Sequence, residues 1–372
     1  MKKNVNKSIG LIAKSVGPSR ANYTHQVDNP EDFLRFDLTE GICWFQDKVV
    51  SWLKEVTVDT VLHYPNASIL KKQHLLSQWL SIEPSRFAIG NGSDELIELI
   101  AQLFLRSGDE CVNVVPSFFR FAEASIRAGA TVRTIPLQLK NRFAWTPTAV
   151  EMMLLELKRE RVKLVWLASP NNPSGVPIPE AVIDQIIASG KIVVLDKVLN
   201  GFPKELQATR RLIKNNKNVI VLSGFSKTFG LPGIRSGFAI TSPEKAKLIS
   251  DRRLPFSSSA ISLFLMEKLL QALIKHEITI PTISEVTRQR LWLEKEINLL
   301  KNIEVVSSST TNLILIKSKR DTRLFETLKQ NGILTTNLNN LDGVENLGLV
   351  RISVRSQKEN EKLVEVLKKM EK

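Results

Sequence analysis

The 372-residue sequence predicts an α/β fold, with a large domain whose mostly parallel sheet is sandwiched by helices and a smaller α+β domain. Near-continuous apolar strands that alternate with helical segments predict the large domain, because such strands are typical of a parallel sheet buried on both faces. The alternation changes after residue 250, which predicts the small domain. We therefore expect an N-terminal arm at residues 1–35, the large domain at 36–250 and the small domain at 251–372.

The arm is basic and has no acidic residue before Asp28. Its apolar stretch at 9–13 is too short for a secretory signal. An organellar transit peptide is one interpretation, and the arm of a cytoplasmic protein is the one we favour. Two cysteines, Cys43 and Cys111, are too few for a disulfide framework, which indicates a reducing compartment.

The composition is typical of a globular protein, with 43% hydrophobic and 24% charged residues. No apolar run approaches the roughly 18 residues that a membrane span needs. The net charge of +14 raises nucleic-acid binding as a hypothesis. The lysines are scattered, however, and no nucleic-acid motif is present, so we rank this hypothesis last and expect no nucleic-acid, membrane or metal partner.

In the first half of the large domain, hydrophobic spacing predicts helices at 45–58 and 68–80, separated by a turn at 63–66. A short strand from Phe87 then leads into a glycine turn, and Ser93 is expected to cap a helix at 94–105. Free N–H groups at such a helix start can bind an anion. Taken alone, this stretch favours a plain cap over an anion site.

Five buried strands follow along the chain. They are expected at 110–115, 131–135, 162–167, 191–195 and 219–222, with helices at 148–160 and 179–189. The carboxyl ends of parallel strands share one sheet edge, where ligands bind in open α/β sheets. We therefore expect Asn172, Asp196 and Lys227, each placed after one of these strands, to converge there.

Lys227 follows its strand in a stretch rich in small residues, next to Ser226 and Gly230. A lysine amine at that edge can form a Schiff base with a carbonyl cofactor. An ordinary exposed lysine in a strand-to-loop turn is the alternative, and this stretch alone leaves both open.

The small domain is expected to contain helices at 258–276, 283–301, 322–331 and 356–369, the last with a capping box from Ser356 to Glu359. Strands are expected at 303–306, 312–316 and 349–354, with an edge strand at 333–336.

Several motifs now occur in the order of a known family. They are Gly90–Leu96 (GNGSDEL), Ser169–Gly175 (SPNNPSG), Asp196, Phe225–Leu231 (FSKTFGL), Arg235 and Val350–Val354 (VRISV). From about residue 36 onward, the chain resembles the class I/II pyridoxal-phosphate aminotransferases of fold type I. Its motifs are most similar to those of the histidinol-phosphate aminotransferase subgroup.

The resemblance implies pyridoxal 5'-phosphate as the cofactor and assigns four residues to its ring. Lys227 would hold the cofactor covalently and later move a proton on the substrate. Asp196 would pair with the pyridine N–H⁺. Asn172 would hydrogen-bond the phenolic oxygen, and Phe118 would stack on the ring.

The resemblance also implies how phosphate and substrate are bound. Ser93 and Asp94, through their backbone N–H groups, would hold the cofactor phosphate together with Ser226 and Arg235. Tyr64 would reach that phosphate across the interface of a homodimer. Arg351 would bind the acidic group of the substrate. The substrates would be a small-molecule amino donor and a 2-oxo acid.

The chain departs from the family pattern at several positions. Leu199 stands where a tyrosine is usual, and Gly224 where the subgroup tends to have a hydroxyl residue. Thr336 aligns roughly with a second phosphate-binding arginine. The early Asn-Glu-Asn-Pro segment of the family corresponds to 39–42 here. These changes leave Lys227 and Asp196 in place. They weaken the assignment of histidinol phosphate as the substrate.

Two alternatives to transamination of histidinol phosphate or a related amine stay open. The stretch Arg351–Arg355 resembles that of threonine-phosphate decarboxylases, in which a second arginine follows. A degenerate, non-catalytic family member is the other alternative, motivated by Leu199 and Gly41.

Overall fold

A computed structural model describes residues 11–12, 29–66, 68–280, 283–320 and 322–371. Most of the expected arm therefore lies outside the described residues. Two of its described segments pair with the body of the protein: β1 (Leu11–Ile12) with β5, and β2 (Leu34–Arg35) with β12. Among the described residues, no helix combines the length and apolar character needed to cross a bilayer.

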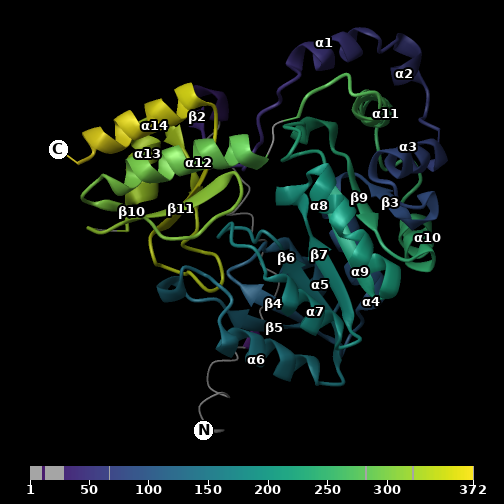
Figure 1. Ribbon diagram of the computed structural model, residues 1–372, viewed down its shortest axis with the longest axis horizontal. Coiled ribbons are helices and arrows are strands. Elements are labelled where there is room, and N and C mark those ends of the chain that lie inside the picture. The colour runs from purple at the N-terminus through teal and green to yellow at the C-terminus, as the bar shows by residue number, and fades with distance from the viewer. Residues whose placement is uncertain (1–10, 13–28, 67, 281–282, 321, 372) are drawn as a thin grey trace.

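An eight-stranded sheet forms the centre of the molecule, in the order β1-β5-β4-β6-β7-β8-β9-β3 (Figure 1). The strands after β1 are β3 Phe87–Gly90, β4 Glu110–Val115, β5 Thr131–Pro136, β6 Val162–Ala168, β7 Ile192–Asp196, β8 Val219–Gly224 and β9 Gly237–Ile240. Strands β4 to β8 are parallel, and β9 runs antiparallel to both of its neighbours. The predicted mostly parallel sheet is confirmed.

Alternate side chains of the sheet enter two hydrophobic cores, because successive residues of a strand point to opposite faces. Trp166 and Val194 lie in one core, and Val165 and Val193 in the other. The first core is covered by α4 Gly92–Phe104, α5 Arg120–Arg127 and α10 Pro243–Arg252. The second is covered by α1 Gln46–Lys54, α3 Leu70–Leu80, α6 Pro147–Leu157, α7 Glu180–Ile187, α8 Pro203–Ala208, α9 Arg210–Asn215 and α11 Ala260–Ile274. The expected helix at 45–58 ends earlier, and a short α2 (Val58–Leu62) follows it.

The smaller unit is a four-stranded antiparallel sheet in the order β10-β11-β14-β13. Its strands are β10 Ile303–Val305, β11 Leu313–Ser318, β13 Thr336–Asn337 and β14 Leu349–Ser353. Its helices are α12 Ile283–Asn298, α13 Leu324–Gln330 and α14 Gln357–Lys369. The expected capping box of α14 is confirmed, with Ser356 and Glu359 bonded reciprocally. The expected strand at 333–336 is wrong as one element: β12 (Ile333–Leu334) pairs with β2, whereas β13 pairs with β14.

Packing across the two units bears on the expected domain boundary. Leu269 of α11 is fully buried in the core beneath the large sheet. Phe36, in contrast, is fully buried in the core of the small sheet. The division at residue 250 stays a prediction, and this packing favours a boundary between α11 and α12 instead.

Candidate active site

A cavity of about 330 Å³ opens at the carboxyl ends of the parallel strands. Every site residue predicted from the sequence lines it, except Tyr64. These residues are Ser93, Asp94, Phe118, Asn172, Asp196, Ser226, Lys227, Arg235 and Arg351. They come from segments that follow β3, β4, β6, β7 and β8, together with β14 of the small sheet. The expected convergence at one sheet edge is therefore confirmed as geometry.

The Lys227 amine is held inside this cavity. Its Nζ donates a hydrogen bond to the backbone oxygen of Leu38 at 2.7 Å. Burial, together with the nearby positive charge of Arg351, lowers the pKa of Lys227 from its ordinary 10.5 to about 8. About a tenth of the amine is therefore uncharged at pH 7, far more than for a lysine with the ordinary pKa, and the uncharged amine is the form that can act as a nucleophile or accept a proton.

Asp196 is the last residue of β7 and is buried. One carboxylate oxygen accepts a hydrogen bond from the Val198 N–H at 2.8 Å. Burial, with a smaller contribution from repulsion by Asp94, raises the pKa of Asp196 to about 7, although the Val198 hydrogen bond and the positive charge of Lys227 act in the opposite direction. Within the described part of the chain, the positive charge of Lys227 acts on this carboxylate and lowers its pKa, but less than burial raises it. A cationic N–H placed opposite Asp196 would stabilise its ionised form.

Asn172 and Arg351 form a pair across the two sheets. The Arg351 Nη1 donates to Asn172 Oδ1 at 2.6 Å. The Arg351 Nη2 donates to the backbone oxygen of Asp37 at 2.6 Å and to the hydroxyl of Thr336 at 3.0 Å. Thr336 thus helps to orient Arg351. Because Asn172 Oδ1 is engaged, its amide NH₂ is the group that it can offer to a ligand.

Helix α4 begins at Gly92, two residues earlier than expected. The expectation that Ser93 caps this helix is wrong, because Ser93 lies within the first turn and Asn91 stands at the cap without a side-chain capping bond. The backbone N–H groups of the first turn have no partner inside the helix and point along its axis. Helix α4 therefore presents an anion-binding end to the cavity that Ser93 and Asp94 line.

Two close approaches shape this helix end. Gly92 has a φ of +78°, and a Cβ built there would lie 2.8 Å from the Arg235 guanidinium. A Cβ at Gly237 would lie 2.7 Å from the Ser93 nitrogen. Arg235 itself has a left-handed φ of +46°, and its Nη2 lies 3.8 Å from the Asp94 carboxylate. Glycine is therefore required for the guanidinium to lie against the helix start.

Tyr64 is not brought to this cavity within one chain. Its side chain is 82% exposed, and its ring lies 4.7 Å from the ring of Phe256, measured between centroids. The sequence placed Tyr64 at a dimer interface, and its contact with a second chain stays a prediction.

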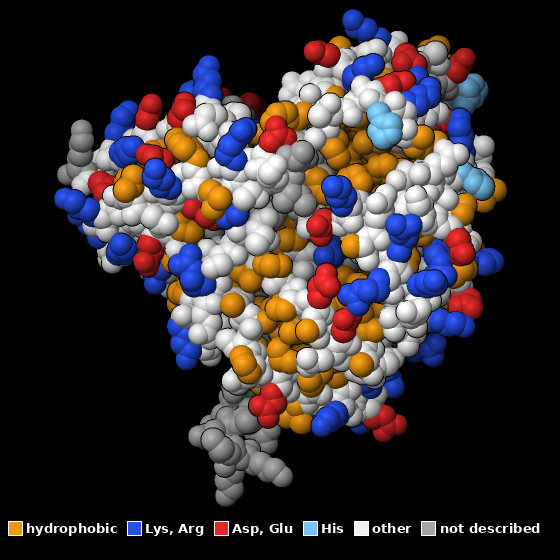
Figure 2. All heavy atoms as spheres, viewed as in Figure 1, with side chains coloured by type: hydrophobic (Ala, Val, Ile, Leu, Met, Phe, Trp, Pro, Cys, Tyr) orange, Lys and Arg blue, Asp and Glu red, His pale blue; other side chains and the backbone are white. Residues whose placement is uncertain are grey.

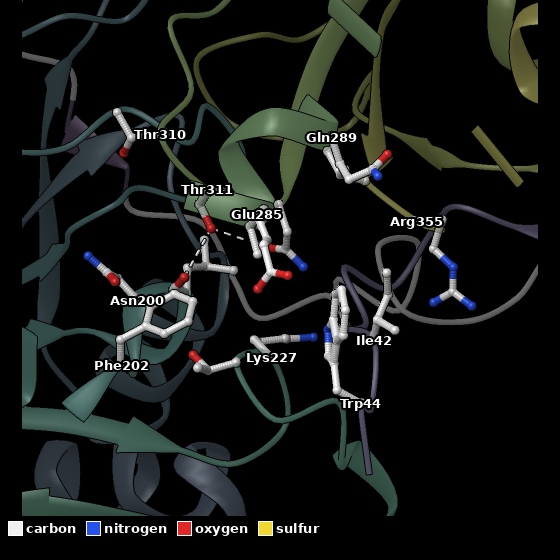
Figure 3. Close-up of a pocket in the computed structure, with 16 residues that line it drawn as sticks. Ile42, Trp44, Asn200, Phe202, Lys227, Glu285, Gln289, Thr310, Thr311 and Arg355 are labelled. Atoms are coloured by element: carbon white, nitrogen blue, oxygen red, sulfur yellow. Dashed lines mark hydrogen bonds between the residues drawn. The ribbon is translucent and has the colours of Figure 1, made fainter. Parts of the chain in front are cut away.

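Sequence analysis noted residues 39–42 as a departure from the family pattern but did not predict that this segment contacts Lys227 (Figure 3). Leu38, Thr39 and Glu40 line the cavity, and the Leu38 oxygen receives the Lys227 amine. Gly41 is the one sequence signal that could have revealed this contact. A Cβ at Gly41 would lie 1.7 Å from the Lys227 carbonyl oxygen.

Replacement of Gly41 by alanine is therefore expected to displace the backbone of Lys227. We expect Gly41→Ala to destabilise the protein by about 1–3 kcal/mol and to weaken cofactor retention, measured by denaturant unfolding and by dialysis. Gly233→Ala is the matched control, because a Cβ at Gly233 meets no atom within 4 Å. If Gly41→Ala and Gly233→Ala had the same free energy of unfolding and the same cofactor retention, the close packing of Gly41 against Lys227 would be contradicted.

Known proteins of similar sequence include two histidinol-phosphate aminotransferases. A histidinol-phosphate aminotransferase from Thermoanaerobacter pseudethanolicus is 29% identical over 338 residues, covering 90% of this chain and 92% of that protein. One from Caldanaerobacter subterraneus subsp. tengcongensis is 30% identical over 349 residues, covering 93% of this chain and 95% of that protein.

Solved structures share the fold. A histidinol-phosphate aminotransferase from Clostridium acetobutylicum has a TM-score of 0.75 at 21% identity and covers 91% of this chain and 98% of its own. An L-threonine-O-3-phosphate decarboxylase from Porphyromonas gingivalis has a TM-score of 0.74 at 21% identity, covering 90% of this chain and 98% of its own. The profile of the family described as aminotransferase class I and II matches residues 46–367. The chain thus belongs to the aminotransferase class I and II family, whose enzymes depend on pyridoxal phosphate.

Proposed function

We propose that this aminotransferase moves an amino group between histidinol phosphate, or a related amino acid or amine, and a 2-oxo acid. The observation that carries the proposal is the meeting of Lys227, Asp196 and Arg351 in one cavity. A nucleophilic amine, a buried acid and an oriented guanidinium are the groups that this reaction needs from the protein. The relatives named above support the choice of amino donor.

The residues present fit pyridoxal phosphate. Asp196 is a buried acid whose pKa stays raised to about 7 despite the positive charge of Lys227, and a pyridine N–H⁺ would stabilise its ionised form. The start of α4 suits a phosphate, because Gly92 leaves its N–H groups accessible beside Arg235. We propose that Ser93, Asp94, Ser226 and Arg235 hold the phosphate, and that Asn172 and Phe118 position the ring.

When bound, the cofactor supplies an electron sink for the bonds at the amine-bearing carbon of the substrate. Lys227 would hold it covalently. The free Lys227 amine would accept and return a proton at the substrate carbon, for which a pKa of about 8 is well placed. Asp196 holds a negative charge in a buried position, which favours a protonated ring nitrogen.

Arg351 is proposed to bind the anionic group of the substrate. Its guanidinium is oriented by Asp37, Thr336 and Asn172, so little conformational entropy is lost on binding. Thr336 stands where the family pattern has a second phosphate-binding arginine, so a neutral hydroxyl replaces a positive charge at this position. We therefore expect weaker phosphate binding than two arginines would give, by about tenfold or more.

A homodimer is proposed as the active unit. Figure 2 shows hydrophobic side chains gathered on the surface beside α11. Large apolar side chains are also exposed on segments before and after Tyr64 in the sequence and at Phe256, which contacts the Tyr64 ring. They include Val58, Val61, Leu62, Leu70, Leu254 and Phe256. A second copy would cover them and could bring its Tyr64 to the phosphate.

The free thiols of Cys43 and Cys111 support a cytoplasmic location.

An amino-donor screen with purified protein and added pyridoxal phosphate tests the proposal. We expect histidinol phosphate to convert the cofactor spectrum to that of its amine form, and a 2-oxo acid to restore it. Carbon dioxide release from O-phosphothreonine, without such conversion, would favour the decarboxylase alternative. Absence of any cofactor band would favour a non-catalytic protein.

A further inference from the structure

The start of helix α4 combines its proposed phosphate-binding role with several negative charges. Asp94, Glu95 and Glu98 all lie in its first two turns. Acids are favourable there because they face the positive end of the helix dipole, but each of them also repels a second anion that approaches the same end. Of these three acids, only Asp94 lines the active-site cavity. A phosphate at this helix start therefore requires that the Asp94 charge be compensated.

Arg120, the first residue of α5, lies against these acids. Its Nε atom is 3.5 Å from Asp94 Oδ1. Its Nη2 donates to Glu98 Oε1 at 2.7 Å, and its Nη1 donates to Glu123 Oε2 at 2.6 Å. Because these two hydrogen bonds fix the plane of the guanidinium, its Nε edge stays directed at Asp94. The Arg120 side chain is 18% exposed and does not line the cavity, so it would act on a bound ligand indirectly, through Asp94.

The Asp94 carboxylate lies between two guanidinium groups. Its Oδ1 faces Arg120, and its Oδ2 is 3.8 Å from Nη2 of Arg235. The Oδ1 atom is buried and accepts no hydrogen bond within the described residues. The charge on this oxygen is therefore balanced by the nearby Arg120 guanidinium rather than by a hydrogen bond.

Loss of the Arg120 charge would act on a bound phosphate in two ways. Asp94 would repel the phosphate with less compensation, and it would attract the Arg235 guanidinium more strongly. Arg235 is one of the groups proposed to hold that phosphate, and its guanidinium already lies against Gly92. Both effects weaken phosphate binding, and both require the Asp94 charge.

We propose that Arg120 is a positioning residue for the phosphate of the cofactor. By balancing the Asp94 carboxylate, Arg120 leaves the first turn of α4 and the Arg235 guanidinium available to a dianion. The inference rests on the proposed function, because that proposal places the phosphate at the start of α4. It adds to the phosphate site a residue of a second helix, α5, that lies outside the cavity.

Arg127, seven residues later on the same helix, provides a matched comparison. Its Nη2 also donates to Glu98 Oε1, and its Nη1 is 3.8 Å from Glu123 Oε2. Arg127 thus shares two carboxylate partners with Arg120, whereas its ion pairs among the described residues do not include Asp94. Substitution of Arg127 therefore removes the same charge beside the same two acids without releasing Asp94.

The test measures two dissociation constants by spectral titration of cofactor-free protein: that of pyridoxal phosphate, and that of pyridoxal, which carries a hydroxyl in place of the phosphate. We expect Arg120→Gln to weaken the binding of pyridoxal phosphate by about fivefold to tenfold and to change that of pyridoxal by less than about twofold. Arg120→Lys keeps the positive charge and should retain most of the preference for the phosphorylated form. Arg127→Gln should stay within about twofold of the wild type for both ligands.

Asp94→Asn supplies a second measurement, because it removes the charge that Arg120 is proposed to balance and keeps the backbone N–H. In that background we expect Arg120→Gln to change the preference for pyridoxal phosphate by less than about twofold. Should Arg120→Gln fail to fold, Arg120→Met preserves the packing of the aliphatic stem and carries the same expectation.

Three outcomes would count against the inference. An equal loss of affinity for both ligands, or the same selective loss with and without the Asp94 carboxylate, would overturn the role of Arg120 and leave the phosphate site standing. An unchanged preference in Arg120→Gln would do the same. If the wild type does not prefer pyridoxal phosphate to pyridoxal, the proposed phosphate site fails and the inference with it.

Discussion

Lys227→Ala is expected to abolish covalent cofactor binding and to lower transamination by about four orders of magnitude or more. The amine is the nucleophile and the proton carrier in the proposed reaction, and its Nζ is fixed 2.7 Å from the Leu38 oxygen. The measurement is the visible absorbance of protein incubated with pyridoxal phosphate, followed by borohydride reduction and peptide mapping. Lys197→Ala is the control, because Lys197 neighbours Asp196 without lining the cavity.

The pH dependence of cofactor incorporation checks the same residue. Since the Lys227 pKa is lowered to about 8, the uncharged amine increases as pH rises through about 8, well below the ordinary 10.5. The rate of incorporation into cofactor-free protein should therefore rise from pH 6 to 8 and level off above about 9. A rate that continues to climb towards pH 10.5 would mean that burial does not act on this amine. Attachment at Lys197 would contradict the assignment outright.

The strands that carry the site were predictable because their sequence signals are local. The strand at 110–115 has the predicted bounds, and Asp196 and Lys227 stand at the ends of short, β-branched apolar runs, whose length and composition favour a strand over a helix. Parallel packing then brings their carboxyl ends together without further information. The sheet edge and its reactive groups could thus be anticipated from the sequence.

Contacts between distant segments could not be predicted in the same way. The hydrogen bond of Lys227 to Leu38 joins residues 189 positions apart, and that of Arg351 to Asn172 joins residues 179 positions apart. Neither hydrogen bond can be inferred from the hydrophobic periodicity or the composition of the segments that it joins. The helix start at Gly92 was missed because a serine-acid sequence resembles a cap, whereas the helix begins one residue before that serine, at a glycine with a φ of +78°.

Asp196→Asn is expected to stabilise the cofactor-free protein while nearly abolishing its activity. The carboxyl has its pKa raised from 3.8 to about 7 by burial, so the folded state binds more protons than the unfolded state between these values. Its contribution to stability is present at acidic pH and is lost as pH rises through about 7. At pH 8 the ionised group costs up to about 4 kcal/mol, which a neutral amide avoids. The amide oxygen can still accept the Val198 N–H.

Denaturant unfolding of the cofactor-free proteins at pH 8 and pH 5 measures this effect. We expect Asp196→Asn to be more stable than the wild type at pH 8 and the difference to shrink at pH 5. With cofactor, the variant should lose about a hundred- to a thousandfold in kcat, because the neutral amide no longer favours a protonated ring nitrogen. Asp184→Asn is the control, since Asp184 forms an exposed pair with Arg211 and its loss should change stability little. If Asp196→Asn gave no stabilisation at pH 8, the buried carboxylate would have to be paired with a cation in the cofactor-free protein. Stabilisation with full activity retained would instead show that the Asp196 charge is not needed for catalysis.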